Sequence, residues 1–154
     1  MRLPVLELDD GTILTESIAI CRYFEELQPE PQLFGTSALG KAKVEMWQRR
    51  LELNLMMPVA QVFRHIHPAM VEWEIPQVPE WGEVNKPKAI EFLHILDKEL
   101  ASREFAAGDD YSVADITGMI AIDFMKPARI AVPDELTHVK RWHQALKARP
   151  SAEA

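Results

Sequence analysis

Residues 2–27, RLPVLELDDGTILTESIAICRYFEEL, combine strand, turn and helix signals around polar side chains. Two short apolar runs, at residues 5–8 and 13–14, flank Asp10-Gly11, a dipeptide that favours the positive φ angles of a tight hairpin turn. Apolar residues at helical spacing follow directly after Thr15-Glu16-Ser17. We therefore expect an antiparallel hairpin and then a helix whose first turn carries hydroxyl and carboxylate groups.

This expected helix start has the chemistry to bind an anion. The first backbone N–H groups of a helix and the positive end of its dipole attract a carboxylate. Ser17 can donate a hydrogen bond to the same carboxylate, and Glu16 can hold a nearby ammonium group. One amino acid presents both charges. The alternative is that Thr15 or Ser17 only caps the helix, which stabilises it by about 1 kcal/mol. These residues alone leave both interpretations open.

The same stretch resembles a known ligand-binding domain. Leu3-Pro4-Val5-Leu6, the hairpin and Glu16-Ser17-x-Ala19-Ile20 are similar to the second half of the glutathione-binding domain of cytosolic glutathione transferases, bacterial members included. In that family the proline follows a cis peptide bond. The resemblance implies that Leu3, before Pro4, pairs its backbone with the cysteinyl unit of glutathione. It also implies that Glu16 and Ser17 bind the α-amino and α-carboxylate groups of the γ-glutamyl end.

Composition excludes several classes of protein. The chain has 154 residues, of which 47% are hydrophobic, enough for a core. A net charge of −7 argues against a nucleic-acid binder, which needs clustered cations to neutralise phosphates. The longest uncharged apolar stretch, residues 116–122, is far shorter than the ~20 residues of a membrane helix. Nothing at the N-terminus resembles a leader, and we expect a cytoplasmic protein.

Cysteine and histidine usage predicts neither a disulfide nor a metal site. One cysteine, Cys21, cannot form an internal disulfide, and its apolar neighbours predict a small core residue. His65 and His67 are two residues apart and do not share a helical face, so we assign no metal.

The remainder of the chain predicts helices. Breakers at residues 30–37 indicate a linker between a partial glutathione-binding domain, residues 1–29, and an all-helical domain, residues 38–150. An apolar stripe predicts a long helix over 38–67, with a kink at 55–58 caused by Pro58. We also expect a connector over 72–87, a helix beginning at Asn85 or Lys86 and ending before Gly108, a buried helix over 113–125, and a last helix from about Asp134 to Pro150.

A second motif begins the predicted buried helix. Ser112 and Asp115 have the spacing of a capping box, and Tyr111 and Ile116 supply the hydrophobic staple across it. We assign these residues a structural role. The motif also resembles the capping sequence that begins the central core helix of the glutathione transferase helical domain.

The resemblance implies a mostly α fold, α+β overall: a thioredoxin-like ββα remnant followed by an all-helical domain. The family's first βαβ unit has no counterpart here, so the chain corresponds to an N-terminally truncated member. The residue that activates the thiol belongs to that unit, and the catalytic residue is therefore unknown in this chain.

The sequence leaves three functions open. The first is a glutathione S-transferase that, in its complete form, conjugates its cosubstrate glutathione to a small apolar electrophile, as a homodimer without metal. The electrophile would lie beside a methionine-rich stretch that includes Met46, Met56 and Met57. The second is a non-catalytic transferase-like binding or protein-interaction module. The third is a generic helical protein in which Glu16-Ser17 is only a helix cap.

Overall fold

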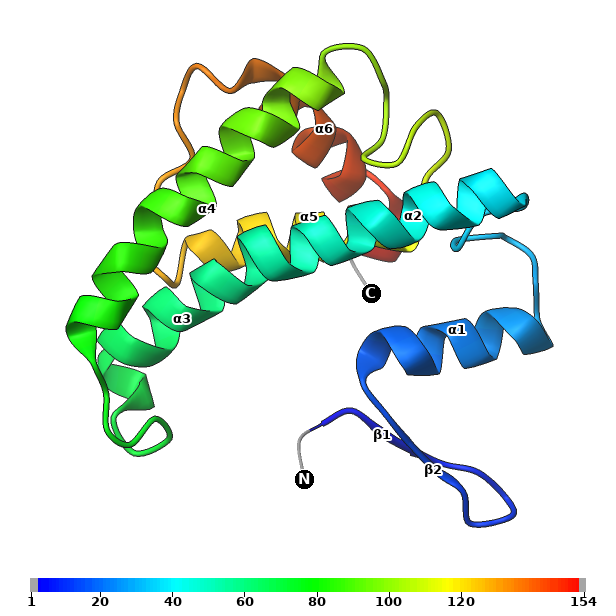
Figure 1. Cartoon of the computed structure of the whole chain (residues 1–154), viewed down its shortest axis with the longest axis horizontal. Coiled ribbons are helices and arrows are strands. Elements are labelled where there is room, and N and C mark those ends of the chain that lie inside the picture. The colour runs from blue at the N-terminus through cyan, green and yellow to red at the C-terminus, as the bar shows by residue number, and fades with distance from the viewer. Residues whose placement is uncertain (1–2, 153–154) are drawn as a thin grey trace.

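The N-terminal unit is a hairpin followed by a helix. The computed structural model describes residues 3–152. Strands β1 (Val5–Glu7) and β2 (Ile13–Thr15) are antiparallel, and α1 (Ser17–Leu27) follows directly. Gly11 adopts the expected positive φ, +83°, and the Asp10 carboxylate accepts a hydrogen bond from the Thr12 N–H at 2.9 Å. The unit lies below α2 in Figure 1, to one side of the other helices.

The structure contains the long helix predicted after the linker. Near the predicted kink, this helix has a π-helical turn. The π-helical turn η1 (Glu52–Met56) joins α2 (Ala38–Leu51) to α3 (Met57–Ile66) in one rod (Figure 1). Pro58 has no N–H to donate to the carbonyl four residues back, and its ring crowds that carbonyl. The backbone widens just before the proline, and Asn54 Nδ2 donates to the carbonyl of Arg50 at 3.0 Å.

The next helix, α4, begins earlier than the sequence predicts. After the short 3₁₀ turn η2 (Pro68–Met70), α4 spans Pro79–Leu100, so the predicted start at Asn85 or Lys86 is wrong. Pro79 stands in the first turn, where a missing N–H costs nothing, and the helix continues through Pro87. Close packing on α3 supports the added turns. A Cβ at Gly82 would lie 2.5 Å from Ile66 Cγ1, so only glycine allows this approach.

Helix α5 (Val113–Met125) is the central helix of the bundle, packed between α2 and α6 (Thr137–Lys147). The final helix, α6, begins at Thr137, a few residues after its predicted start at about Asp134. The 3₁₀ turn η3 (Pro150–Ala152) follows it. A Cβ at Gly118 would lie 2.5 Å from Trp142 Cη2 and 3.1 Å from Leu51 Cδ2. The missing side chain is what lets α5 come this close to its neighbours. The largest fully buried side chains include Trp47, Trp142, Leu51, Leu55, Leu93, Leu96, Leu100 and Met125.

The core belongs to the helical part alone. None of residues 3–33 is buried, and the core begins at Phe34. Leu3, Phe24 and Leu27 are 91%, 51% and 64% exposed. Cys21 is exposed as well, so its expected place in a core is wrong. Of its apolar neighbours on α1, Ile18 is partly buried against the bundle core, whereas Phe24 and Leu27 remain exposed.

Candidate functional site

The antiparallel register brings the predicted site residues to one end of the hairpin. Val5 pairs with Thr15, so the residues just outside this pair, Pro4 and Glu16, emerge at the same end. The Leu3–Pro4 peptide bond is cis, as the resemblance implies. Two segments that are a dozen residues apart in the sequence thus lie side by side, which sequence spacing alone does not establish.

The start of α1 has free backbone N–H donors, because no side chain among residues 3–152 caps it. Glu16 is the N-cap residue, with φ 67° and ψ 115°, and neither its own side chain nor a neighbour's makes a capping hydrogen bond. The interpretation of Thr15 or Ser17 as a simple cap is therefore wrong. A non-glycine residue in this conformation costs of order 1–3 kcal/mol and is most often found at functional sites. Glu16 and Ser17 are both exposed.

Chemically, this end of the hairpin can hold a zwitterionic group. The uncapped N–H groups and the Ser17 hydroxyl are donors for a carboxylate, and the Glu16 carboxylate is an acceptor for an ammonium. No acidic residue in the first turn of α1 competes for these donors. The sheet in residues 3–152 has two strands, so the second edge of β1 is open for a ligand or a further strand.

The cavities in the described residues lie elsewhere. An open cleft of about 590 Å³ lies between the linker, the start of α2 and the loop before α5, lined in part by Thr36, Lys43 and Asp110. A groove of about 440 Å³ runs between η1–α3 and α4, and Met57 lines it with Leu53 and Trp81. Neither is lined by the hairpin residues. Within residues 3–152, no cluster of His, Cys, Asp and Glu has the geometry of a metal site.

Asp115 accepts more hydrogen bonds than a capping box requires. Its Oδ2 accepts hydrogen bonds from the Ser112 N–H and hydroxyl, each at 2.9 Å. Its Oδ1 accepts from Ala106 N–H at 2.8 Å and from Trp142 Nε1 at 2.9 Å. The residue is fully buried, and burial raises the pKa of its carboxyl although these hydrogen bonds lower it. The local motif predicts Ser112 as a partner, whereas the bonds to Ala106 and Trp142 depend on tertiary structure.

Two family models match the chain. Residues 1–32 match the glutathione S-transferase N-terminal domain, and residues 56–150 match the glutathione S-transferase C-terminal domain. The chain belongs to the glutathione S-transferase family. The hairpin unit and the helical part thus each match a domain of this family.

Individual relatives of the chain come from the same family. The chain is 38% identical over 150 residues to glutathione S-transferase 2 of Saccharomyces cerevisiae, an alignment that covers 97% of this chain and 64% of the relative. The crystal structure of Gtt2 from the same yeast matches with a TM-score of 0.93 and 37% identity, over 99% of this chain and 74% of that one. A class Gtt2 transferase of Vibrio parahaemolyticus gives 0.88 and 38%, over 99% and 72%.

The chain therefore spans less than two thirds of the yeast relative's length. Among residues 3–152, no helix combines the length and the apolar character that crossing a membrane requires.

Proposed function

We propose that this chain binds glutathione at the end of the hairpin and that the complete protein conjugates the bound thiol to small apolar electrophiles. Leu3 and Pro4 would align the cysteinyl unit, while Glu16 and Ser17 hold the γ-glutamyl end. The observation that carries the proposal is the start of α1, which no side chain among residues 3–152 caps and which lies, by the strand register, at the same end of the hairpin as Pro4.

Binding at this site does not by itself explain catalysis. A thiol with a pKa near 8.5 is only a few per cent ionised at neutral pH, so lowering this pKa is the central task of the enzyme. The thiolate then attacks an electrophilic carbon, forming a carbon–sulfur bond as the leaving group departs, or adding across an activated double bond. Among the four proposed binding residues, Glu16 is assigned to the ammonium group, and Leu3, Pro4 and Ser17 carry no base that could take the thiol proton. We expect the activating group to come from outside this set.

The site assignment can be tested by calorimetric titration of glutathione into the chain. Ser17→Ala and Glu16→Gln should each weaken binding by about tenfold or more. The first removes a hydrogen bond to the carboxylate, and the second removes the negative charge that pairs with the ammonium group. The matched controls are Ser37→Ala, at the exposed N-cap of α2, and Glu26→Gln on α1, which should leave the affinity unchanged. Equal affinity in all four variants would show that glutathione binds elsewhere.

A parallel assay of conjugation to an aryl halide, made with the complete protein, separates the two remaining functions, because no thiol-activating residue is assigned in this chain. Saturable binding with turnover indicates a transferase. Saturable binding without turnover indicates a glutathione-binding module, in which the helical part serves another purpose.

We further propose that the protein is a cytoplasmic homodimer. A two-stranded hairpin is marginally stable alone, and the exposed Phe24 and Leu27 on α1 present apolar surface that a second subunit can cover. Phe24→Ser should lower the dimer affinity by about tenfold in analytical ultracentrifugation, because it removes a large apolar contact. A sedimentation profile that Phe24→Ser does not change would place the interface on another face.

A further inference from the structure

The connector between η2 and α4 exposes four large apolar side chains. Val71, Trp73, Ile75 and Val78 are 60%, 79%, 80% and 41% exposed. They lie on one short loop that extends past the ends of α3 and α4, at the far end of the molecule from α1 (Figure 1). Isolated exposed apolar residues are ordinary, whereas several close together in sequence make a candidate interaction surface. We call Val71, Trp73, Ile75 and Val78, with Glu72 and Glu80, the connector surface.

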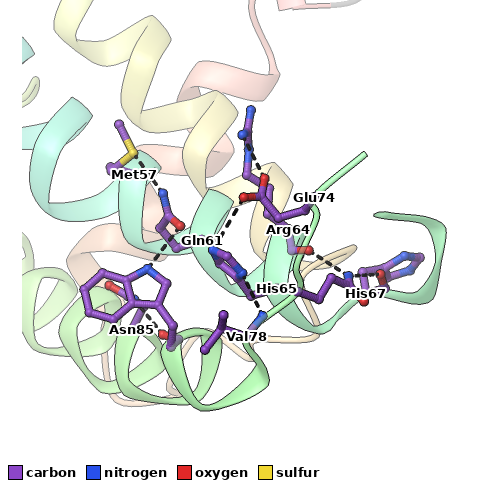
Figure 2. A network of polar contacts seen from close by, with 10 residues as sticks. Met57, Gln61, Arg64, His65, His67, Glu74, Val78 and Asn85 are labelled. Carbon is purple, nitrogen blue, oxygen red and sulfur yellow. Dashed lines mark hydrogen bonds and ion pairs between the residues drawn. The ribbon is translucent and has the colours of Figure 1, made fainter. Parts of the chain in front are cut away.

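The loop is held in place by polar contacts to α3 (Figure 2). Arg64 Nη1 and Glu74 Oε2 form an ion pair at 3.2 Å. Gln77 Nε2 donates to the carbonyls of Arg64 at 2.8 Å and His67 at 3.0 Å, and the Val78 N–H donates to His65 Nδ1 at 3.1 Å. The apolar side chains therefore extend from a loop that is already ordered, which lowers the entropy cost of binding a partner.

The charge of the connector specifies the kind of partner. Residues 69–84 contain four Glu and no Lys, Arg or His. Glu74 and Glu83 pair with Arg64 and Lys86, which leaves Glu72 and Glu80 without an ion-pair partner among residues 3–152. An apolar surface with unpaired carboxylates is complementary to a segment that is both apolar and cationic.

We propose that the connector surface docks a basic amphipathic helix of a partner protein. The apolar face of that helix packs on Trp73 and Ile75, and its Lys or Arg side chains pair with Glu72 and Glu80. A second copy that docks connector to connector is a poor occupant, because Glu72 and Glu80 would face the same carboxylates of the other copy. An anionic membrane is repelled for the same reason.

The test uses the whole chain and a synthetic amphipathic helix of leucine and lysine as the probe. Fluorescence anisotropy of the labelled probe should give saturable binding that weakens as salt is raised. Trp73→Ser with Ile75→Ser should reduce the affinity by about tenfold or more, and Glu72→Gln with Glu80→Gln by a smaller factor. All four residues are exposed, so circular dichroism should show an unchanged fold.

Matched controls distinguish docking from general attraction to an acidic protein. Ile120→Ser on α5 and Glu135→Gln before α6 change residues that are also exposed but lie far along the chain, and should leave the affinity unchanged. Equal losses in the controls and the connector variants would overturn the proposal. So would dissociation of a dimer by Trp73→Ser, which would make a second copy the occupant, or loss of vesicle binding in that variant, which would make the occupant a membrane.

Discussion

Asp115 is a buried carboxylate that organises three separate segments of the chain. It receives hydrogen bonds from the loop at Ala106, from Ser112 at the start of its own helix and from Trp142 on α6. No cation forms an ion pair with it in the described part of the chain. Its negative charge is therefore stabilised by dipoles alone, and burial raises the pKa of the carboxyl above the ordinary value of 3.8.

The raised pKa gives a pH dependence with a definite sign. Between pH 3.8 and the raised pKa the folded state binds more protons at Asp115 than the unfolded state does. The contribution of Asp115 to stability is thus complete below that interval and declines as the pH rises through the folded pKa. In urea unfolding at a series of pH values, the advantage of the wild type over Asp115→Asn should be greatest in acid and shrink towards neutrality.

Asp123 provides a control of opposite sign. Partial burial raises the pKa of Asp123, but hydrogen bonds from Lys147 and His143 outweigh it, and the pKa lies below its ordinary value. Its contribution is present above that ordinary value and is lost as the pH falls, so the advantage of the wild type over Asp123→Asn should grow as the pH rises. Parallel curves for the two variants would contradict the assignment of Asp115.

At the scale of elements, the bundle depends on how closely α5 approaches α2 and α6. Gly118 is the point of closest approach, since an added Cβ would lie 2.5 Å from Trp142 Cη2, in a ring that is itself fully buried. Gly118→Ala should therefore lower the free energy of unfolding by about 1–3 kcal/mol, measured by urea denaturation. Gly40→Ala is the matched helical control. Its nearest neighbour is the exposed Ser37 hydroxyl at 3.1 Å, and its effect should stay below about 1 kcal/mol.

Local sequence patterns predicted those elements whose signals are themselves local. The Asp10-Gly11 turn, the effect of Pro58 on the long helix and the Ser112–Asp115 capping box each depend on neighbouring residues, and the structure contains all three. The sequence predicts a start of α4 at Asn85 or Lys86, because Pro76, Pro79 and Pro87 indicate a connector there, whereas packing of Gly82 against α3 stabilises the earlier turns. Tertiary contacts that a local pattern does not contain decided that boundary.

In the candidate site, too, local patterns predict individual residues, whereas tertiary structure decides how they come together. Glu16 and Ser17 are recognisable from their position before an apolar helix, but their approach to Pro4 follows from the strand register. The positive φ of Glu16 has no sequence signal either, because glutamate rarely adopts that conformation. Cys21 was placed in a core by its apolar neighbours, yet the face of α1 that it occupies is exposed.

At the scale of the whole molecule, the hairpin unit and the helical bundle are joined chiefly through the linker. The Glu25 carboxylate on α1 accepts hydrogen bonds from the N–H groups of Leu33 at 2.7 Å and Phe34 at 3.1 Å. On the other side, the Val113 N–H donates to the Leu33 carbonyl at 3.0 Å, and the Phe34 ring is buried in the bundle core. The linker residues Leu33 and Phe34 thus connect α1 to α5, and the ion pair between Arg22 and Glu45 is an exposed addition.

This arrangement predicts that Glu25 controls the docking of the hairpin unit without controlling the stability of the bundle. Glu25→Ala leaves two partly buried N–H groups without their acceptor, and a hydrogen bond to a charged group contributes about 1.5–3 kcal/mol. Hydrogen exchange of α1 amides should therefore accelerate by about tenfold or more, while the slowest amides of α5 keep their rates. Glu26→Ala, at the exposed neighbouring position, should change neither. If α5 exchanged faster together with α1 in Glu25→Ala, the two parts would unfold as one cooperative unit, and the linker would not be the joint between them.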